Sequence, residues 1–121
     1  MIGLISINYK YAPVEIREQF DFSSEQKIEF FNILKTDYNV GGLMILSTCN
    51  RTEIYFDYEN HNGYESKLMH GILKALVEYK SFEESLSPYI EKKINKDVVE
   101  HMFRVVAGLE SMIVGEYQIV E

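Results

Sequence analysis

Four stretches of the chain carry the side-chain pattern of β-strands. Residues 2–8 alternate apolar and small side chains, 43–48 form a continuous apolar run, and 52–58 are rich in aromatic and β-branched residues, which strands favour. A fourth strand is predicted at 89–94, where lysines would blunt an exposed sheet edge. The intervening segment 49–51 is then a tight connection at the end of the sheet.

Apolar residues at helical intervals predict two long helices between these strands. The first runs from about 24 to 38, where apolar side chains recur every three or four residues and Ser23 with Gln26 has the spacing of a capping box. The second carries leucines and isoleucine at the same intervals and ends near Lys80. The order of elements is therefore strand, helix, strand, strand, helix, strand.

The region after the second long helix carries further local signals. Ser81 with Glu84 repeats the capping-box spacing and predicts a short helix that ends before Pro88. Asn95 is expected to cap a last amphipathic helix, which Gly108 is expected to stop. Together the elements predict an α+β fold, a ferredoxin-like split βαβ (βαββαβ) sandwich with an additional C-terminal helix.

The composition is that of one ordinary globular domain. The 121 residues are 46% hydrophobic and 26% charged, which suits a single core. The formal net charge of −7 argues against broad nucleic-acid binding, which neutralises many phosphates with Lys and Arg, but it permits one local contact. No membrane span or secretory signal is visible. A single cysteine excludes an internal disulfide, so we expect a cytoplasmic protein with no membrane partner.

The lone cysteine, Cys49, is the first candidate for chemistry. It follows an apolar run and is surrounded by hydroxyl, amide, guanidinium and carboxylate side chains. It is either a partly buried residue at a strand end or a nucleophile, and the cation of Arg51 favours the nucleophilic thiolate. Arg51 has two further interpretations, a bidentate grip on a substrate carboxylate or a surface ion pair with Glu53 of little energetic value.

His101 is the second candidate. It lies on the apolar side of the last predicted helix, so it is either a satisfied core residue or a proton-transfer group that approaches Cys49. His61 and His70 have no comparable context, and no zinc-ligand spacing links these residues. The chain contains no G-x-G-x-x-G and no Walker A loop, so it does not visibly bind a redox cofactor.

Several motifs together resemble one family. They are Ser47-Thr48-Cys49-Asn50-Arg51-Thr52-Glu53, His101-Met102-Phe103-Arg104-Val105, Gly108-Leu109-Glu110-Ser111, Gly115-Glu116-Tyr117-Gln118-Ile119 and an opening segment over 7–18. In type and order they are similar to the N-terminal catalytic domain of glutamyl-tRNA reductases, and the resemblance covers the whole chain.

The resemblance implies a mechanism. A cysteine thiolate, matched by Cys49, attacks the ester that joins glutamate to the 3′ end of its tRNA, and a thioester remains on the enzyme. Hydride from NADPH, bound on a separate following domain, reduces the thioester to glutamate-1-semialdehyde, which feeds tetrapyrrole synthesis. The implied partners are the aminoacyl end of glutamyl-tRNA, a second subunit in a homodimer and the next enzyme of the pathway, which would receive the product.

The resemblance also implies a set of site residues. Cys49 matches the nucleophile, and His101 matches a histidine important for activity. The residues that match the wall of the glutamyl pocket are Thr48, Asn50, Arg51, Ser111, Glu116, Tyr117 and Gln118. The sequence departs from the family at Tyr9, usually histidine, at Tyr11, usually threonine, and at Tyr117, usually proline.

The segment 115–121 ends in the middle of a helical pattern, which is typical of the front part of a longer protein. Residues 1–121 are therefore expected to be the catalytic, substrate-binding domain, without the NADPH-binding and dimerisation domains, and to be unable to reduce glutamyl-tRNA alone. Two alternatives stay open. One is a cysteine-dependent acyl hydrolase, and the other is a non-catalytic ferredoxin-like binding module.

Overall fold

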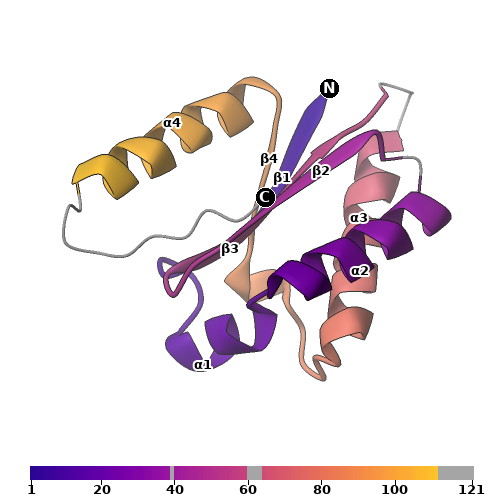
Figure 1. Cartoon of the computed structure of the whole chain (residues 1–121), viewed down its shortest axis with the longest axis horizontal. Coiled ribbons are helices and arrows are strands. Elements are labelled where there is room, and N and C mark those ends of the chain that lie inside the picture. Colours follow the sequence, from indigo (N-terminus) through magenta and orange to yellow (C-terminus); the bar gives the residue numbers. More distant parts are fainter. Residues whose placement is uncertain (39, 60–63, 112–121) are drawn as a thin grey trace.

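The computed structural model describes residues 1–38, 40–59 and 64–111, with four strands and four α-helices (Figure 1). The strands are β1 (Ile2–Asn8), β2 (Gly42–Ser47), β3 (Arg51–Asp57) and β4 (Glu91–Ile94). The helices are α1 (Val14–Arg17), α2 (Ser24–Asp37), α3 (Tyr64–Lys80) and α4 (Lys96–Ser111). Two short 3-10 helices, Glu18–Phe20 and Ser87–Tyr89, complete the described elements. No helix in these ranges is both long and apolar enough to cross a membrane.

The four strands form one antiparallel sheet in the order β2-β3-β1-β4. The two central strands, β1 and β3, pair along their full length, so that Ser6 lies opposite Glu53 and Asn8 lies opposite Arg51. This order, with helices between β1 and β2 and between β3 and β4, is the split βαβ arrangement. The predicted α+β fold class is confirmed.

Helices cover both faces of the sheet. In Figure 1, α2 and α3 lie on one side of the strands and α4 lies on the other. The larger core fills the first side and includes Ile5, Phe30 and Ile54, whereas a smaller core with Leu4 and Tyr55 lies beneath α4. Because successive strand residues point to opposite faces, every second residue of β3 faces α4.

Local signals in the sequence account for several boundaries. Ser23 and Gln26 form the predicted capping box of α2, in which the Gln26 N–H donates to Ser23 Oγ at 3.2 Å and the Ser23 N–H donates to Gln26 Oε1 at 2.9 Å. The Asn95 carbonyl accepts the first helical hydrogen bonds of α4, but its side chain instead accepts from the Ile2 N–H at 3.2 Å. Asn95 therefore ties the start of α4 to the beginning of β1.

The structure corrects two expectations about helices and adds one helix that was not predicted. The prediction of a helix before Pro88 is wrong, because residues 82–86 form no helix and only Ser87–Tyr89 forms a 3-10 turn. Gly108 does not stop the last helix, which continues to Ser111; a helical glycine costs only about 1 kcal/mol, and the buried face of α4 outweighs it. The short helix α1 was not predicted, since it is a single turn that follows Pro13.

Gly3, the second residue of β1, allows the large ring of Phe56 to lie across the strand. A Cβ at Gly3 would lie 2.3 Å from Phe56 Cζ, and Phe56 is buried. We expect Gly3→Ala to lower the free energy of unfolding by about 1–3 kcal/mol through overpacking. The control Gly42→Ala, where a Cβ meets nothing within 4 Å, should change it by less than about 0.5 kcal/mol. Urea denaturation measures both, and equal losses would contradict this account.

Candidate active site

Cys49 is exposed at the turn between β2 and β3. Hydrogen bonds hold both sides of this turn: the Thr48 N–H donates to the Arg51 carbonyl at 2.8 Å, and the Asn50 N–H donates to Thr48 Oγ1 at 3.2 Å. The Tyr9 N–H also donates to the Asn50 carbonyl at 3.0 Å. The turn occupies 48–50 rather than the predicted 49–51, and it presents the thiol to solvent on a fixed backbone.

A cleft of about 220 Å³ lies beside this turn. Thr48 and Asn50, the two neighbours of Cys49 in sequence, line it together with Arg51 and His101. Cys49 is not itself a lining residue, so its thiol lies next to the cleft on the exposed turn. The structure therefore brings four of the predicted site residues to one place beside the candidate nucleophile.

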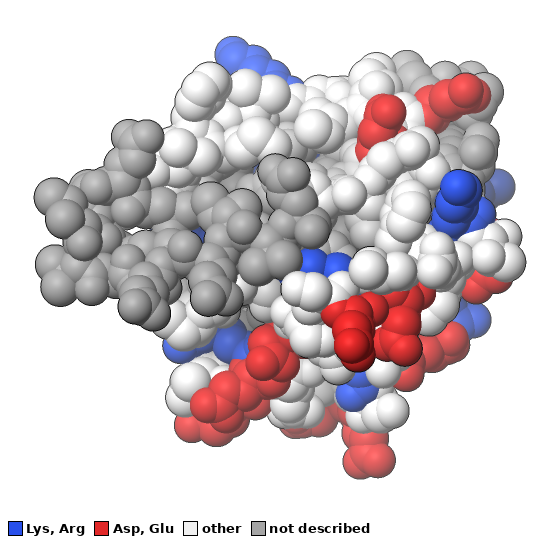
Figure 2. Space-filling view, viewed as in Figure 1, with Lys and Arg blue, Asp and Glu red and all other residues white. Residues whose placement is uncertain are grey.

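The cleft is locally basic in an acidic protein. Lys10, Arg51 and Arg104 line it, against one lining carboxylate, Glu91. By contrast, acidic side chains gather over the lower part of the view in Figure 2, where α1 and α2 lie. A cleft lined by one sign of charge raises the local concentration of ligands of the opposite sign, so this cleft suits an anionic ligand.

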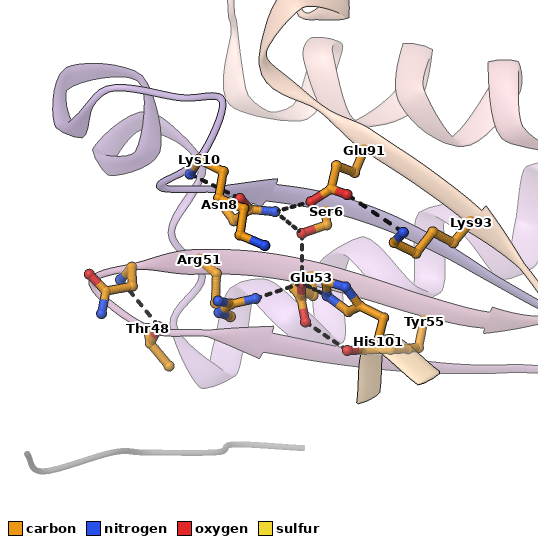
Figure 3. Close-up of polar contacts among 11 residues, drawn as sticks. Ser6, Asn8, Lys10, Thr48, Arg51, Glu53, Tyr55, Glu91, Lys93 and His101 are labelled. Atoms are coloured by element: carbon orange, nitrogen blue, oxygen red, sulfur yellow. Dashed lines mark hydrogen bonds and ion pairs between the residues drawn. The ribbon is translucent and has the colours of Figure 1, made fainter. Parts of the chain in front are cut away.

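Beneath the cleft lies a wholly buried carboxylate, Glu53 on β3, at 0% exposure. Its Oε2 accepts from Ser6 Oγ at 2.6 Å, contacts His101 Nε2 at 2.5 Å and accepts from Arg51 Nη1 at 3.2 Å. Its Oε1 accepts from Tyr55 Oη at 2.6 Å. Figure 3 shows Glu53 at the centre of these side chains, which come from β1, β3 and α4.

Burial and hydrogen bonding oppose each other at Glu53. Burial raises the pKa of its carboxyl, but the hydrogen bonds from His101, Ser6 and Tyr55 outweigh burial, and the net effect is a lowered pKa. Glu53 is therefore an anion near neutral pH. The pKa of the Tyr55 phenol is raised, first by burial and then by the charge of Glu53, so this hydroxyl stays protonated and donates.

Asn8 extends the network to the edge strand β4. Its Nδ2 donates to Ser6 Oγ at 2.9 Å and to Glu91 Oε1 at 2.8 Å, and its Oδ1 accepts from the Lys10 N–H at 3.0 Å. Glu91 in turn pairs with Lys93 at 3.6 Å. Asn8 thus fixes the start of the loop that brings Lys10 to the cleft.

Arg51 is held on two sides. Besides its ion pair with Glu53, its guanidinium carbon lies 5.7 Å from the centroid of the Tyr9 ring, a cation–π arrangement. The ion pair with Glu53 anticipated from the sequence exists, but it is not a surface pair, because the Glu53 side chain is 0% exposed and that of Arg51 is 17% exposed.

The remaining candidates differ in how far the structure describes them. His101 is buried and also lines the cleft; its proton-transfer role stays a prediction. Ser111 ends α4, and nothing is described of its side chain. Glu116, Tyr117 and Gln118 lie outside the described residues, as does His61. His70 lines a different groove, beside α3.

Sequence reasoning missed the role of Glu53 and the cleft position of Arg104. The sequence did indicate that Glu53 is unusual, because this carboxylate lies in the middle of an aromatic-rich strand. That strand is central in the sheet and is covered on both faces. A carboxylate in such a strand must find donors. The identity of those donors could not be read from the neighbouring sequence, because Ser6 and His101 are 47 and 48 residues away from Glu53.

The cleft beside Cys49 is small for a dinucleotide, and the described residues group no metal site. The sequence lacks a glycine-rich phosphate loop, and the cleft of about 220 Å³ is below the roughly 300–1,000 Å³ of pockets for drug-sized ligands. Within 1–38, 40–59 and 64–111, no three His, Cys, Asp or Glu residues are grouped to hold a metal. An acyl group of amino-acid size matches the cleft better.

Comparisons with known proteins identify relatives of this chain. The sequence model of a family described as "Glutamyl-tRNAGlu reductase, N-terminal domain" matches residues 5–121. The chain is 42% identical over 118 residues to a glutamyl-tRNA reductase of Shouchella clausii, covering 95% of this chain and 25% of that protein. It is 38% identical to one of Bacillus subtilis, covering 98% and 25%.

A solved structure of a similarly named protein also resembles this chain. Glutamyl-tRNA reductase from Methanopyrus kandleri superposes with a TM-score of 0.60 at 29% identity, covering 95% of this chain and 24% of that one. The chain thus spans about a quarter of the length of the relatives it matches.

The hydrogen bond from Tyr55 to Glu53 should stabilise the fold more than a similar bond at the surface. Tyr55→Phe leaves a buried carboxylate oxygen without its donor, and we expect a loss of about 1–3 kcal/mol in the free energy of unfolding at pH 7. The control Tyr79→Phe removes a bond of 2.5 Å to the exposed Glu29 and should cost less than about 0.5 kcal/mol. Chemical denaturation tests this ranking, which equal or reversed costs would overturn.

The charge of Glu53 should make stability depend on acid. Because its folded-state pKa is lowered, its contribution is fully present above the unfolded-state value of about 4.3 and is lost as pH falls through the folded value. The advantage of the wild type over Glu53→Gln in free energy of unfolding should therefore shrink between about pH 5 and pH 2. Glu84→Gln, which alters an exposed carboxylate, is the control. A wild-type advantage that stayed constant over this interval would refute the assignment.

Proposed function

This chain belongs to the glutamyl-tRNA reductase family, and we propose that it carries out the acyl-transfer half of that family's reaction. In this proposal residues 1–121 are the catalytic, substrate-binding domain, and the substrate is the glutamyl ester at the 3′ end of tRNA. The observation that carries the proposal is the exposed Cys49 on a fixed turn, between two residues that line a basic cleft. Relatives named glutamyl-tRNA reductase over the whole length of the chain support it.

The proposed step exchanges an oxygen ester for a thioester. The Sγ of Cys49 gives up its proton and attacks the carbonyl carbon of the glutamyl ester. The bond from that carbon to the 3′-oxygen of the tRNA breaks, and the 3′-oxygen takes up a proton and leaves as a hydroxyl. A thioester accepts hydride more readily than an ester does, so the exchange divides a difficult reduction into two easier steps.

The cleft residues have distinct proposed roles in this step. Arg51 would bind the glutamyl side-chain carboxylate with the N–H groups that its bond to Glu53 leaves available, which a guanidinium with five donors allows. His101 would take the thiol proton. Thr48 and Asn50, with Ser111, Glu116, Tyr117 and Gln118, would form the pocket wall, as the family resemblance implies.

The reduction itself is not assigned to these residues. The family resemblance implies NADPH as the hydride donor, and the cleft beside Cys49, of about 220 Å³, is small for a dinucleotide. As the family resemblance implies, we assign NADPH binding, homodimer formation and transfer of the semialdehyde to a following enzyme to the longer family protein rather than to these residues. A lone free thiol also suits a reducing compartment such as the cytoplasm.

A labelling experiment tests the acyl-transfer step. The chain is mixed with tRNA charged with radiolabelled glutamate, quenched in acid, treated with ribonuclease and separated on a gel. We expect up to one label per chain, removed by neutral hydroxylamine as a thioester is, and none on Cys49→Ser. Because Cys49 is the only cysteine, no other thiol can carry the label. With NADPH added, the chain alone should produce no semialdehyde.

Substrate and variant controls separate the alternatives. tRNA charged with glutamine, the neutral counterpart, should acylate Cys49 at least 10-fold more slowly if Arg51 reads the carboxylate. Release of free amino acid from many aminoacyl esters, without label on the chain, would favour the acyl hydrolase. Label that persists on Cys49→Ser, or its absence on the wild type, would contradict the proposal.

A further inference from the structure

Four side chains contact the Glu53 carboxylate, and two of them line the cleft. His101 and Arg51 both line the cleft, and both contact the same oxygen, Oε2 of Glu53. We propose that Glu53 is a positioning residue for the site, which sets the tautomer of His101 and orients the guanidinium of Arg51. The inference rests on the proposed acyl transfer for its kinetic consequences, but its structural part stands independently.

The His101 tautomer follows from the hydrogen-bonding capacity of the carboxylate. An ionised carboxylate only accepts hydrogen bonds, so the contact of 2.5 Å between Oε2 and His101 Nε2 requires the proton to be on Nε2. The neutral ring then has its lone pair on Nδ1. A histidine held in this way by a carboxylate is a directed proton acceptor, because the partner fixes both the ring orientation and the tautomer.

The same carboxylate has an electrostatic effect on the proposed step. When the thiol proton of Cys49 moves to Nδ1, directly or through water, the ring becomes a cation beside the anion of Glu53. Such a carboxylate stabilises the imidazolium without taking the proton itself. The proton then passes to the 3′-oxygen as the ester bond breaks, so the exchange is balanced and the ring returns to its starting form.

Arg51 is oriented by the same group. Its Nη1 donates to Oε2 at 3.2 Å, while the Tyr9 ring lies 5.7 Å from its guanidinium carbon. A guanidinium held at one edge and over one face has few remaining orientations, so less entropy is lost when its remaining N–H groups bind a substrate carboxylate. Glu53 thus couples the group that binds the substrate to the group that accepts the proton.

A purely structural role would predict something different. The hydrogen bond between His101 and Glu53 also fastens α4 to the sheet, and a structural carboxylate would affect stability alone. The two roles separate in two measurements, the reactivity of Cys49 and the acylation rate, while the His101 tautomer tests the hydrogen bond on which the inference rests. A variant matched for position is Thr52→Val, because Thr52 is the neighbour of Glu53 on β3, is also buried, and faces the opposite side of the sheet.

The tautomer is measured by NMR on the wild-type chain labelled with ¹⁵N-histidine, at a pH where the rings are neutral. The His101 signals are identified by their loss in His101→Gln. We expect a protonated Nε2 and an unprotonated Nδ1 for His101. A protonated Nδ1 would overturn the proposal, and because this measurement does not use Glu53→Gln, it applies even if that variant does not fold.

The consequence for reactivity is measured on Glu53→Gln, which keeps the shape of the side chain and removes its charge. We expect Cys49 acylation by glutamyl-tRNA at saturating substrate to slow by about 10- to 100-fold. Alkylation of Cys49 by iodoacetamide at neutral pH should slow as well. Thr52→Val should change both rates by less than about 3-fold, and circular dichroism verifies that each variant is folded.

These outcomes distinguish the inference from the proposed function. If the wild type forms no thioester but shows the expected tautomer, and alkylation slows in folded Glu53→Gln, acyl transfer fails and the positioning role stands. If folded Glu53→Gln retains wild-type acylation and alkylation rates, or Thr52→Val slows them equally, Glu53 is structural and the inference is overturned.

Discussion

A single buried anion, the carboxylate of Glu53, joins the parts of this fold that the site depends on. It is 0% exposed and lies between the sheet and α4, with donors from β1, β3 and α4. An isolated charge in such a place would be too costly to bury. Each contact that satisfies it therefore also positions an element: Ser6 comes from the neighbouring strand, and His101 from the helix that covers this face of the sheet.

Strand register determines which groups reach that anion. Along β3, Arg51, Glu53 and Tyr55 share the face toward α4, while Thr52, Ile54 and Phe56 face the larger core. A shift of one residue would move Glu53 into the apolar core and Arg51 away from the cleft. Because β1 pairs with β3 over its full length, Ser6 lies directly opposite Glu53, and Asn8 lies opposite Arg51. The site is thus a consequence of sheet pairing as much as of local motif.

Several features of the fold and of the site are encoded in short windows of sequence, and these features could be predicted. Strand patterning, the capping box at Ser23 and the polar setting of Cys49 all lie within short windows of sequence, and the fold class follows from the order of elements. The contact between Glu53 and His101 could not be predicted, because it joins residues 48 apart through tertiary packing. Gly108 was misjudged for the related reason that packing of a helix face overrides local propensity.

The exposed thiol of Cys49 and the buried carboxylate of Glu53 meet two different requirements of the proposed reaction. A nucleophile for an ester at the end of a large nucleic acid has to be accessible, and Cys49 lies on an exposed turn. The group proposed to assist it, His101, would work better when held rigidly in a region of low dielectric constant, and it is buried against Glu53. The cleft beside Cys49 brings basic side chains together in a chain of net charge −7. These basic side chains suit the anionic aminoacyl end of the proposed substrate, although the chain as a whole is acidic.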